Sequence, residues 1–248
     1  MRRIWISLLC LIALTALATG YRFRNHLPYE LSEPLGLRAD ISEIRARVLP
    51  GLADDLATQD LQIGASLYLR IFKEEAELEL WVQNGRQYQR YKTYPICTFS
   101  GAIGPKLQEG DGQSPEGFYA VDLAALNPRS SYHLSFNLGF PNAYDSAQGR
   151  TGSFLMVHGD CVSIGCYAMT DPLIEEIYLL VEAALRNGQT AVPVHAFPFR
   201  MTPSRMAEAE GHQWQGFWQQ LQPAYLQFEE TYVPPVVSVH QGRYIVEP

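Results

Sequence analysis

The sequence lacks a basic stretch, an internal repeat and a second cysteine or histidine pair of the kind that closes a structural zinc site. Its 19 lysine and arginine residues are outnumbered by 26 aspartate and glutamate residues, so the net charge is −7 at pH 7. Non-specific nucleic-acid binding depends on clustered positive charge, which is missing here. We therefore expect no nucleic-acid partner, no bound metal and no cofactor.

The remaining composition is that of an ordinary globular protein. The 248 residues are 47% hydrophobic and 18% charged, and 12% of them are aromatic. A chain of this length can bury one sizeable core, and its aromatic content argues against extended disorder. We expect one main domain with a smaller addition.

A run without charged residues occupies residues 4–19, directly after Arg2 and Arg3. Together with the small residues Ala18-Thr19-Gly20, this pattern is typical of a secretory signal peptide over residues 1–20. If the segment is not cleaved, it is a marginal N-terminal membrane anchor, because spanning a bilayer normally takes about 20 apolar residues. In both cases we expect the rest of the chain to be exported.

Residues 21–60 are polar, with apolar residues at near-helical spacing that Pro50 interrupts. We expect one or two short helices here, serving as a leader or linker. From residue 61 the pattern alternates with a period of two, which predicts strands, and Asn84-Gly85 is a strong turn signal. The predicted strands cover residues 65–72, 76–82, 87–98, 118–123, 132–137, 154–157 and 192–199.

One helix is predicted within this strand-rich region, from Asp171-Pro172 to Asn187-Gly188. Asp171 can cap the helix, and an apolar stripe follows at helical spacing. After residue 200 we expect a helical run over 206–228, whose aromatic residues favour core packing over glycan stacking, and a hairpin over 236–246. The prediction is a mainly β catalytic domain with a buried helix, an α+β fold, over residues 61–200, followed by a C-terminal extension over 201–248.

The most informative segment contains a histidine, His158, eight residues before a cysteine, Cys166, in the sequence Ser163-x-Gly165-Cys166. A thiol nucleophile needs a nearby base and hydrogen-bond donors for the developing oxyanion. We predict that His158 is the base and that the amides of Gly165, Cys166 and Tyr167 are the donors. Cys166 stands about five residues before the helix, so we do not expect the helix dipole to lower its pKa.

A zinc site is the alternative interpretation of this segment. His158, Cys161 and Cys166 form an H-x2-C-x4-C pattern, and Asp160 could supply an oxygen ligand. The second pair that usually closes such a site is missing, which favours the nucleophile.

These residues resemble the L,D-transpeptidase (YkuD-like) catalytic domain, whose signature is His-Gly followed by Ser-x-Gly-Cys. The resemblance extends over about residues 62–246 and is greatest for the branch of meso-diaminopimelate protein amidases. It implies a β-sandwich-like fold, a periplasmic location and a peptidoglycan substrate. It also implies that Cys166 is the nucleophile, that His158 is its base and that the Gly159 carbonyl orients the imidazole. Segments outside the motif that look like this branch are 71–75, 114–119, 139–145 and 198–202.

One position departs from the family pattern. Many members carry an arginine two residues after the cysteine, where this chain has Ala168. An arginine there could bind a substrate carboxylate through two parallel hydrogen bonds. Its absence disfavours a donor peptide that ends in a free D-alanine carboxylate. The amidase branch instead cuts the amide between diaminopimelate and the C-terminal lysine of an outer-membrane lipoprotein.

We therefore expect a cysteine hydrolase or transpeptidase that acts on peptidoglycan stem peptides, and on lipoprotein linked to them, through a thioester acyl-enzyme at the L-centre of meso-diaminopimelate. Hydrolysis of the diaminopimelate–lysine amide is the favoured reaction. The alternatives are a transpeptidase that forms 3–3 cross-links or attaches lipoprotein, and a non-catalytic wall-binding module. We expect membrane contact only through an uncleaved N-terminal segment.

Several further polar residues are candidates for lining the substrate site. Each has a structural alternative, such as a turn role for Asn142 and Tyr144 or a solvated surface position for the charged residues. The candidates are Ser163, Asn142, Tyr144, His133 and Lys106, with Arg129 as a further cationic group.

Export would leave three cysteines, Cys97, Cys161 and Cys166, and an odd number leaves at least one thiol free or paired between chains. Cys97 ends a predicted strand, and Cys161 lies in the loop between His158 and Cys166. We predict a Cys97–Cys161 disulfide that ties this loop to the sheet and leaves Cys166 free. The alternative is that Cys97 and Cys161 are unpaired buried thiols.

Overall fold

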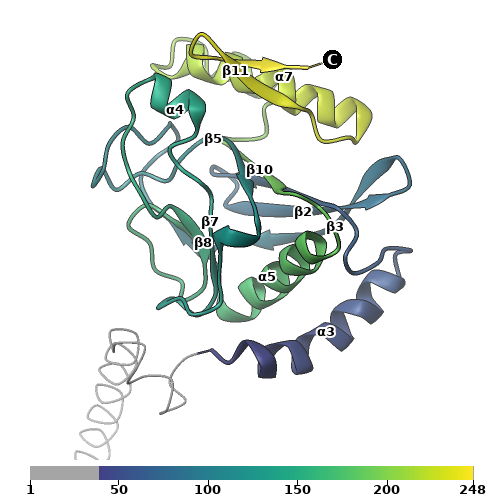
Figure 1. Cartoon of the computed structure of the whole chain (residues 1–248). Coiled ribbons are helices and arrows are strands. Elements are labelled where there is room, and N and C mark those ends of the chain that lie inside the picture. Colours follow the sequence, from purple (N-terminus) through teal and green to yellow (C-terminus); the bar gives the residue numbers. More distant parts are fainter. Residues whose placement is uncertain (1–38, 248) are drawn as a thin grey trace, which may run out of the picture.

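The computed structural model describes residues 39–247, which form two five-stranded sheets, a central helix and a C-terminal layer (Figure 1). The predicted signal peptide or anchor lies outside the described residues. Within residues 39–247, none of the helices has the length and apolar character needed to cross a bilayer.

The first sheet has the strand order β3-β2-β1-β10-β5. Strands β1 and β10 are parallel, and the other neighbours are antiparallel. Its strands match the predicted alternating segments, because their inward faces carry the apolar residues of the main core. The bounds are β1 Leu67–Phe72, β2 Glu77–Asn84, β3 Gln87–Pro95, β5 Gly117–Val121 and β10 Val192–Phe197.

The second sheet has the order β4-β9-β8-β7-β6 and is built from very short strands. Strands β8 and β9 are parallel, although only eight residues connect them. The bounds are β4 Thr98–Phe99, β6 Leu126–Asn127, β7 Ser135–Asn137, β8 Met156–His158 and β9 Tyr167–Ala168, with a single 3-10 turn, η1, at Leu123–Ala125.

Helix α5, Asp171–Arg186, contacts strands of both sheets and is the buried helix that the sequence predicts. The predicted cap is wrong in detail. Thr170 precedes the helix, and the Asp171 carboxylate instead accepts a hydrogen bond of 2.8 Å from the Asp160 amide. Asp171 therefore connects the helix start to the loop that follows β8.

Helix α3, Ile41–Ala57, lies along α5 (Figure 1). The predicted interruption at Pro50 does not occur. Pro50 is exposed, and the apolar face that includes Leu52 and Leu56 is buried. Packing of this face compensates for the one hydrogen bond that proline cannot donate. Two ion pairs, Arg45–Glu182 at 2.6 Å and Arg47–Glu175 at 2.7 Å, add contacts to α5.

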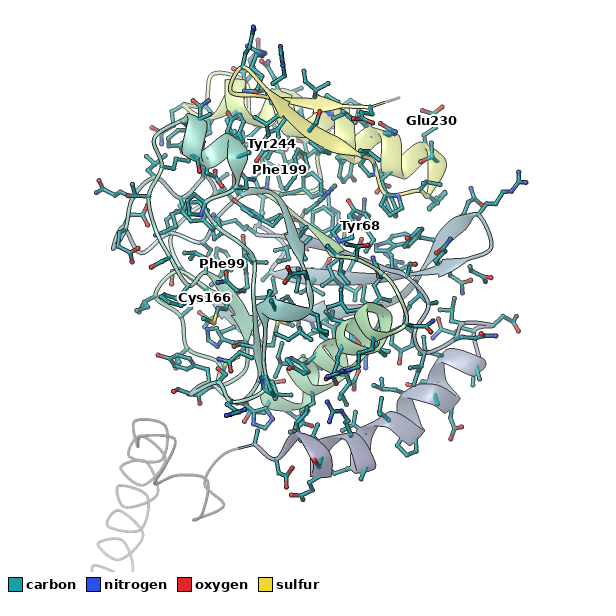
Figure 2. The ribbon with its side chains drawn as sticks, in the orientation of Figure 1. Tyr68, Phe99, Cys166, Phe199, Glu230 and Tyr244 are labelled. Atoms are coloured by element: carbon teal, nitrogen blue, oxygen red, sulfur yellow. A yellow bond between two sulfur atoms is a disulfide. The ribbon has the colours of Figure 1, made fainter. Side chains whose placement is uncertain are left out.

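The C-terminal extension covers the other face of the first sheet (Figure 1). The predicted single helical run is two helices, α6 Pro203–Glu208 and α7 Gln215–Thr231, and the predicted hairpin is β11 Val237–His240 with β12 Arg243–Val246. The aromatic side chains of α7 pack against the sheet, as the spacing predicts. Figure 2 shows Tyr244 of β12 and Phe199 where this layer meets the sheet, well apart from Cys166.

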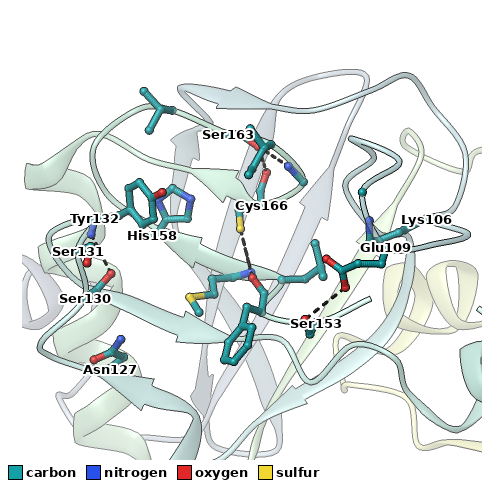
Figure 3. Close-up of a pocket in the computed structure, with 17 residues that line it drawn as sticks. Lys106, Glu109, Asn127, Ser130, Ser131, Tyr132, Ser153, His158, Ser163 and Cys166 are labelled. Carbon is teal, nitrogen blue, oxygen red and sulfur yellow. Dashed lines mark hydrogen bonds between the residues drawn. The ribbon is translucent and has the colours of Figure 1, made fainter. Parts of the chain in front are cut away.

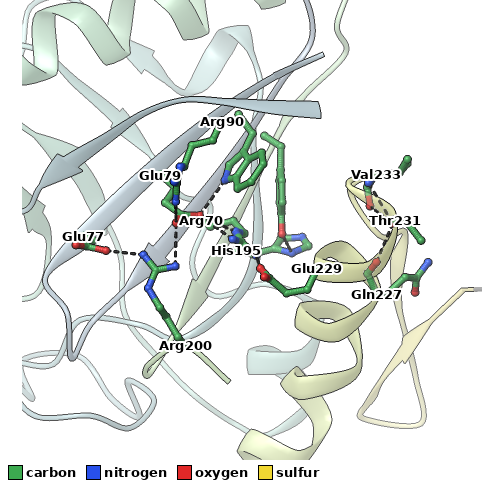
Figure 4. Close-up of polar contacts among 12 residues, drawn as sticks. Arg70, Glu77, Glu79, Arg90, His195, Arg200, Gln227, Glu229, Thr231 and Val233 are labelled. Atoms are coloured by element: carbon green, nitrogen blue, oxygen red, sulfur yellow. Dashed lines mark hydrogen bonds and ion pairs between the residues drawn. The ribbon is translucent and has the colours of Figure 1, made fainter. Parts of the chain in front are cut away.

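An ion pair joins the extension to the sheet and belongs to a network of charged side chains (Figure 4). Arg70 on β1 contacts Glu79 on β2 at 2.7 Å and Glu229 on α7 at 2.6 Å. Arg200, just after β10, contacts Glu79 at 2.8 Å. Arg70 and Glu79 are almost fully buried, so removing either partner would leave an uncompensated charge in the interior.

Candidate functional site

The register of β8 and β9 brings the histidine and the cysteine of the motif together. Val157 lies opposite Tyr167 and His158 lies opposite Ala168, so His158 ends one strand while Cys166 directly precedes the other. Both side chains line one cavity of about 510 Å³ (Figure 3). The motif is thus a single site on two neighbouring strands.

The Cys166 thiol is not involved in a disulfide, and it is partly enclosed. Its Sγ accepts a hydrogen bond from the Met156 amide at 3.4 Å. Burial raises the pKa of the Cys166 thiol, while the Met156 amide and the positive charge of Lys106 oppose this change. The resting thiol is therefore protonated near neutral pH and requires a base before it can attack a carbonyl.

The His158 imidazole is suited to that task. It is 2% exposed, and its Nδ1 lies 2.6 Å from the Gly159 carbonyl oxygen. A carbonyl only accepts hydrogen bonds, so Nδ1 carries the proton and Nε2 has its lone pair available. Burial lowers the pKa of His158, although the hydrogen bond to Gly159 partly offsets this, so the ring is neutral at pH 7. The Tyr132 ring packs against it at 4.8 Å.

Close packing explains the glycine after the histidine. A Cβ at Gly159 would lie 2.6 Å from Asp171 Oδ1 and 3.0 Å from the Cβ of His133, so a side chain would displace the start of α5. The backbone of Gly159 is therefore fixed where its carbonyl meets the imidazole.

Serine hydroxyls hold the backbone on either side of the thiol. The Cys166 carbonyl accepts hydrogen bonds from Ser163 Oγ at 2.8 Å and from Ser114 Oγ at 3.0 Å. Ser100 Oγ lies 2.8 Å from Ser163 Oγ. Two loops that are distant in the sequence thus fix the position of Cys166.

The expectation that Gly165 supplies an oxyanion donor is not supported by this geometry. Its amide donates to Ser163 Oγ at 3.1 Å and is already engaged, and its φ of +148° fits the sharp turn that the sequence predicts. Tyr167 has a buried side chain whose hydroxyl donates to the Pro115 carbonyl at 2.6 Å. An oxyanion role for the amides of Cys166 and Tyr167 stays a prediction.

Among the other predicted lining residues, only Ser163 and Lys106 border the cavity. Lys106 is not a free cation, because its ammonium group contacts Asp111 at 2.5 Å. Arg129 does not line the cavity. A solvated surface position was the expected alternative for Lys106, but it is 3% exposed.

Three of the predicted lining residues lie elsewhere, and those predictions are wrong. Asn142 caps the short helix α4, Ala143–Ala147, which is close to the turn role given as its alternative. Tyr144 stacks on Tyr244 of the extension, with ring centroids 4.2 Å apart. His133 Nε2 lies 2.8 Å from Glu175 on α5. The Asn142 amide also donates to the Phe118 carbonyl at 2.8 Å, so all three side chains contact partners that are distant in sequence.

Sequence reasoning missed most of the cavity wall. Three of the missed side chains are large, apolar and exposed: Ile164 is 89% exposed, Phe154 71% and Val162 51%. We call these three residues the apolar rim. Ile164 lies within the cysteine motif itself, so an apolar residue in an otherwise polar loop was the available signal. The polar residues missed are Glu109, Asn127, Ser130, Ser131 and Ser153.

The structure pairs Cys97 with Cys161, with their Cα atoms 5.4 Å apart, and leaves Cys166 unpaired. This is the predicted arrangement. The disulfide ties the loop after β8 to the segment before β4, as expected. It also removes Cys161 from the ligand set of the alternative zinc site, because a bridged sulfur is not a thiolate ligand.

Comparison with known proteins agrees with this geometry. Residues 67–198 match the family described as the YkuD L,D-transpeptidase catalytic domain. The chain belongs to this family. The predicted family and α+β fold are therefore confirmed, and the family acts on peptidoglycan.

Full-length relatives extend the match beyond the family domain. The chain is 52% identical over 184 residues to YafK of Escherichia coli K12, which is itself named only provisionally as an L,D-transpeptidase. The alignment covers 74% of this chain and 75% of YafK, and the O157:H7 protein gives the same values.

Similar solved structures include proteins of two further bacteria. The helical cell shape determining protein Pgp2 of Campylobacter jejuni is 15% identical, with a TM-score of 0.44 and coverage of 75% of this chain and 79% of that chain. Bd1075 of Bdellovibrio bacteriovorus is 18% identical, with a TM-score of 0.40 and coverage of 71% and 77%.

Proposed function

We propose that this protein is a periplasmic cysteine amidase of the L,D-transpeptidase family. Its substrate is the amide between the L-centre of meso-diaminopimelate and the lysine side chain of a peptidoglycan-linked lipoprotein. The observation that carries the proposal is the pairing of a protonated thiol, Cys166, with a neutral imidazole, His158, at one cavity.

The chemistry begins with attack of Cys166 Sγ on the diaminopimelate carbonyl carbon while His158 Nε2 takes the thiol proton. Collapse of the tetrahedral intermediate breaks the C–N bond, and His158 returns the proton to the departing lysine amine. A thioester acyl-enzyme remains. Water then attacks the thioester, His158 accepts a proton from it, and the same proton restores the Cys166 thiol. The Gly159 carbonyl holds the imidazole in the required tautomer and stabilises its charged form.

Two features of the site support hydrolysis of a lipoprotein link. Ala168 is buried between β4 and β8, so no cation stands there to bind the terminal carboxylate of a tetrapeptide donor. The apolar rim formed by Phe154, Val162 and Ile164 offers little to a stem peptide of small polar residues. It suits the apolar side chains of a polypeptide attached through lysine.

Two alternative functions remain, and one of them shares the thioester intermediate. A transpeptidase would resolve the same thioester with an amine, either in a 3–3 cross-link or in attachment of lipoprotein. A non-catalytic wall-binding module would be favoured by a blocked cavity or a bridged Cys166, whereas the cavity is open and the thiol is unpaired.

The test is a competition assay on the exported part of the chain. We would offer a lysine-linked muropeptide and a plain tetrapeptide pair together and identify the products by mass. We expect release of the lysine-bearing peptide to outpace 3–3 dimer formation. Faster formation of 3–3 dimers would mean that the protein acts mainly as a transpeptidase and not as an amidase.

Two variants test the assigned chemistry. Cys166→Ala should be inactive, and His158→Ala should lose about 10²–10⁴-fold in rate. His240→Gln changes an exposed histidine of β11 that does not line the cavity, and it serves as the matched control, expected to retain activity. An active Cys166→Ala variant would overturn the proposal.

A further inference from the structure

Lys73 is a fully buried cation that the chemistry at Cys166 does not use directly. It follows β1, and its ammonium group donates to the carbonyls of Ala102 at 2.8 Å, Gly104 at 2.9 Å and Ser114 at 3.0 Å. These three carbonyls belong to one long loop, residues 100–116. A single buried charge therefore gathers both ends of this loop.

Glu116 balances this charge, and it is also fully buried. Its Oε1 lies 3.2 Å from Lys73 Nζ and accepts the Gly104 amide at 2.5 Å. Its Oε2 accepts the indole N–H of Trp218 at 2.9 Å. Trp218 lies on α7, so the C-terminal extension supplies one of the hydrogen bonds that orient this buried carboxylate.

The loop that Lys73 holds also holds the nucleophile. Ser114 accepts the Ser100 amide at 3.0 Å and donates to the Cys166 carbonyl at 3.0 Å. Ser100 contacts Ser163, which donates to the same carbonyl. Lys106, whose charge opposes the rise in the pKa of Cys166, lies in this loop as well.

We propose that Lys73 is a positioning residue for the reaction at Cys166, and that Trp218 of the C-terminal extension holds it in place through Glu116. The inference rests on the proposed function and adds that the extension is part of the catalytic apparatus. Two of the segments that carry the amidase-branch resemblance, 71–75 and 114–119, supply Lys73 and Glu116. Neither segment lines the cavity.

The central variant is Trp218→Phe, which keeps a buried aromatic ring and removes the N–H donor to Glu116 together with part of the indole volume. We expect kcat to fall about 10-fold, because a hydrogen bond to a charged group is lost, while KM changes less than about twofold. The matched control is Tyr225→Phe, which deletes a polar group from the same buried face of α7. It should keep the wild-type kcat.

Two readouts separate positioning from general destabilisation. The pH midpoint for alkylation of Cys166 by iodoacetamide should rise in Trp218→Phe, because Lys106 moves with the loop. The kcat effects of Trp218→Phe and Ser114→Ala should be less than additive, since both act on the same path, whereas Tyr225→Phe and Ser114→Ala should combine additively. If Lys73→Met folds, it should lower kcat more than Trp218→Phe does. If Lys73→Met does not fold, the result for Trp218→Phe alone decides whether the inference holds.

The outcomes distinguish this inference from the proposed function. Activity in Cys166→Ala would overturn the proposed function and the inference with it. An inactive Cys166→Ala combined with wild-type kcat and an unchanged alkylation profile in Trp218→Phe would overturn the inference alone.

Discussion

His158 and Ala168 lie directly opposite each other on the parallel strands β8 and β9. This pairing brings the imidazole to the same cavity as the thiol two residues earlier, Cys166, although seven residues of chain lie between them. It also means that the position where many family members carry an arginine is a buried strand position in this protein. One register thus brings the proposed catalytic pair together and leaves an alanine at the position where the family resemblance implies a carboxylate-binding arginine.

The ionisation of the pair predicts a particular pH dependence. The pKa of Cys166 is raised and that of His158 is lowered, so both groups are neutral at rest. We expect alkylation of Cys166 to rise with pH, with a midpoint above about 8.5, the ordinary thiol pKa. The value of kcat/KM should fall in acid only below about pH 6.5, as His158 becomes protonated. An alkylation midpoint below pH 7 would instead indicate a resting thiolate–imidazolium pair.

Removal of the disulfide should weaken the folded state. Cys97 and Cys161 are 64 residues apart, and closing a loop of that size stabilises a protein by about 4 kcal/mol in the chain-entropy model. We expect the double variant Cys97→Ser/Cys161→Ser to lose stability of that order in urea titration. Reduced wild-type protein is the control and should show a similar loss. Equal midpoints for oxidised and reduced protein would contradict the prediction.

His195 predicts a loss of stability in acid. Burial, with a smaller contribution from the charge of Arg70, lowers the pKa of His195 to about 3, and its Nδ1 lies 2.7 Å from the Tyr68 hydroxyl. Between that value and about 6.5 the unfolded chain binds a proton that the folded protein does not. The free energy of unfolding should therefore fall as pH drops below 6.5, by up to about 1.4 kcal/mol per unit from this residue.

The variant His195→Gln cannot titrate, and its amide can still accept the Tyr68 hydrogen bond. Its stability should therefore depend less steeply on pH between 6.5 and 5 than that of the wild type. Urea titrations at several pH values would measure the two slopes. Identical slopes would mean that His195 is protonated in the folded protein.

The apolar rim should contribute to substrate affinity. Ile164→Asp and Phe154→Asp each remove an exposed apolar contact beside the cavity. We expect KM for a lysine-linked polypeptide substrate to rise about 10-fold, since partial burial of such a side chain stabilises by about 1–1.5 kcal/mol. The alkylation rate of Cys166 should stay the same. Leu123→Asp, at a 48% exposed position that does not line the cavity, is the matched control.

Local patterns in the sequence determined the elements of the fold. Alternation with a period of two predicted the strands of the first sheet, and the apolar stripe after Pro172 predicted α5, because these periods reflect which face each element buries. The spacing of His158, Ser163, Gly165 and Cys166 indicated the candidate site. The three cysteines expected after export indicated one free thiol, and the positions of Cys97 and Cys161 indicated the disulfide. The helix interruption predicted at Pro50 is wrong because a tertiary contact, the packing of α3 on α5, outweighed the local preference of proline.

Only the tertiary structure decided what surrounds the site. Nothing in the local sequence of Lys73 indicates that it meets Glu116, or that Trp218 on a distant helix completes this pair. Tyr144 and His133 carry polar groups suited to a substrate site, yet each contacts a partner far away in the chain, Tyr244 and Glu175. Periodicity specifies the face on which a side chain lies. The partners it meets depend on how the sheets, α5 and the extension pack, and those contacts join residues that no local pattern connects.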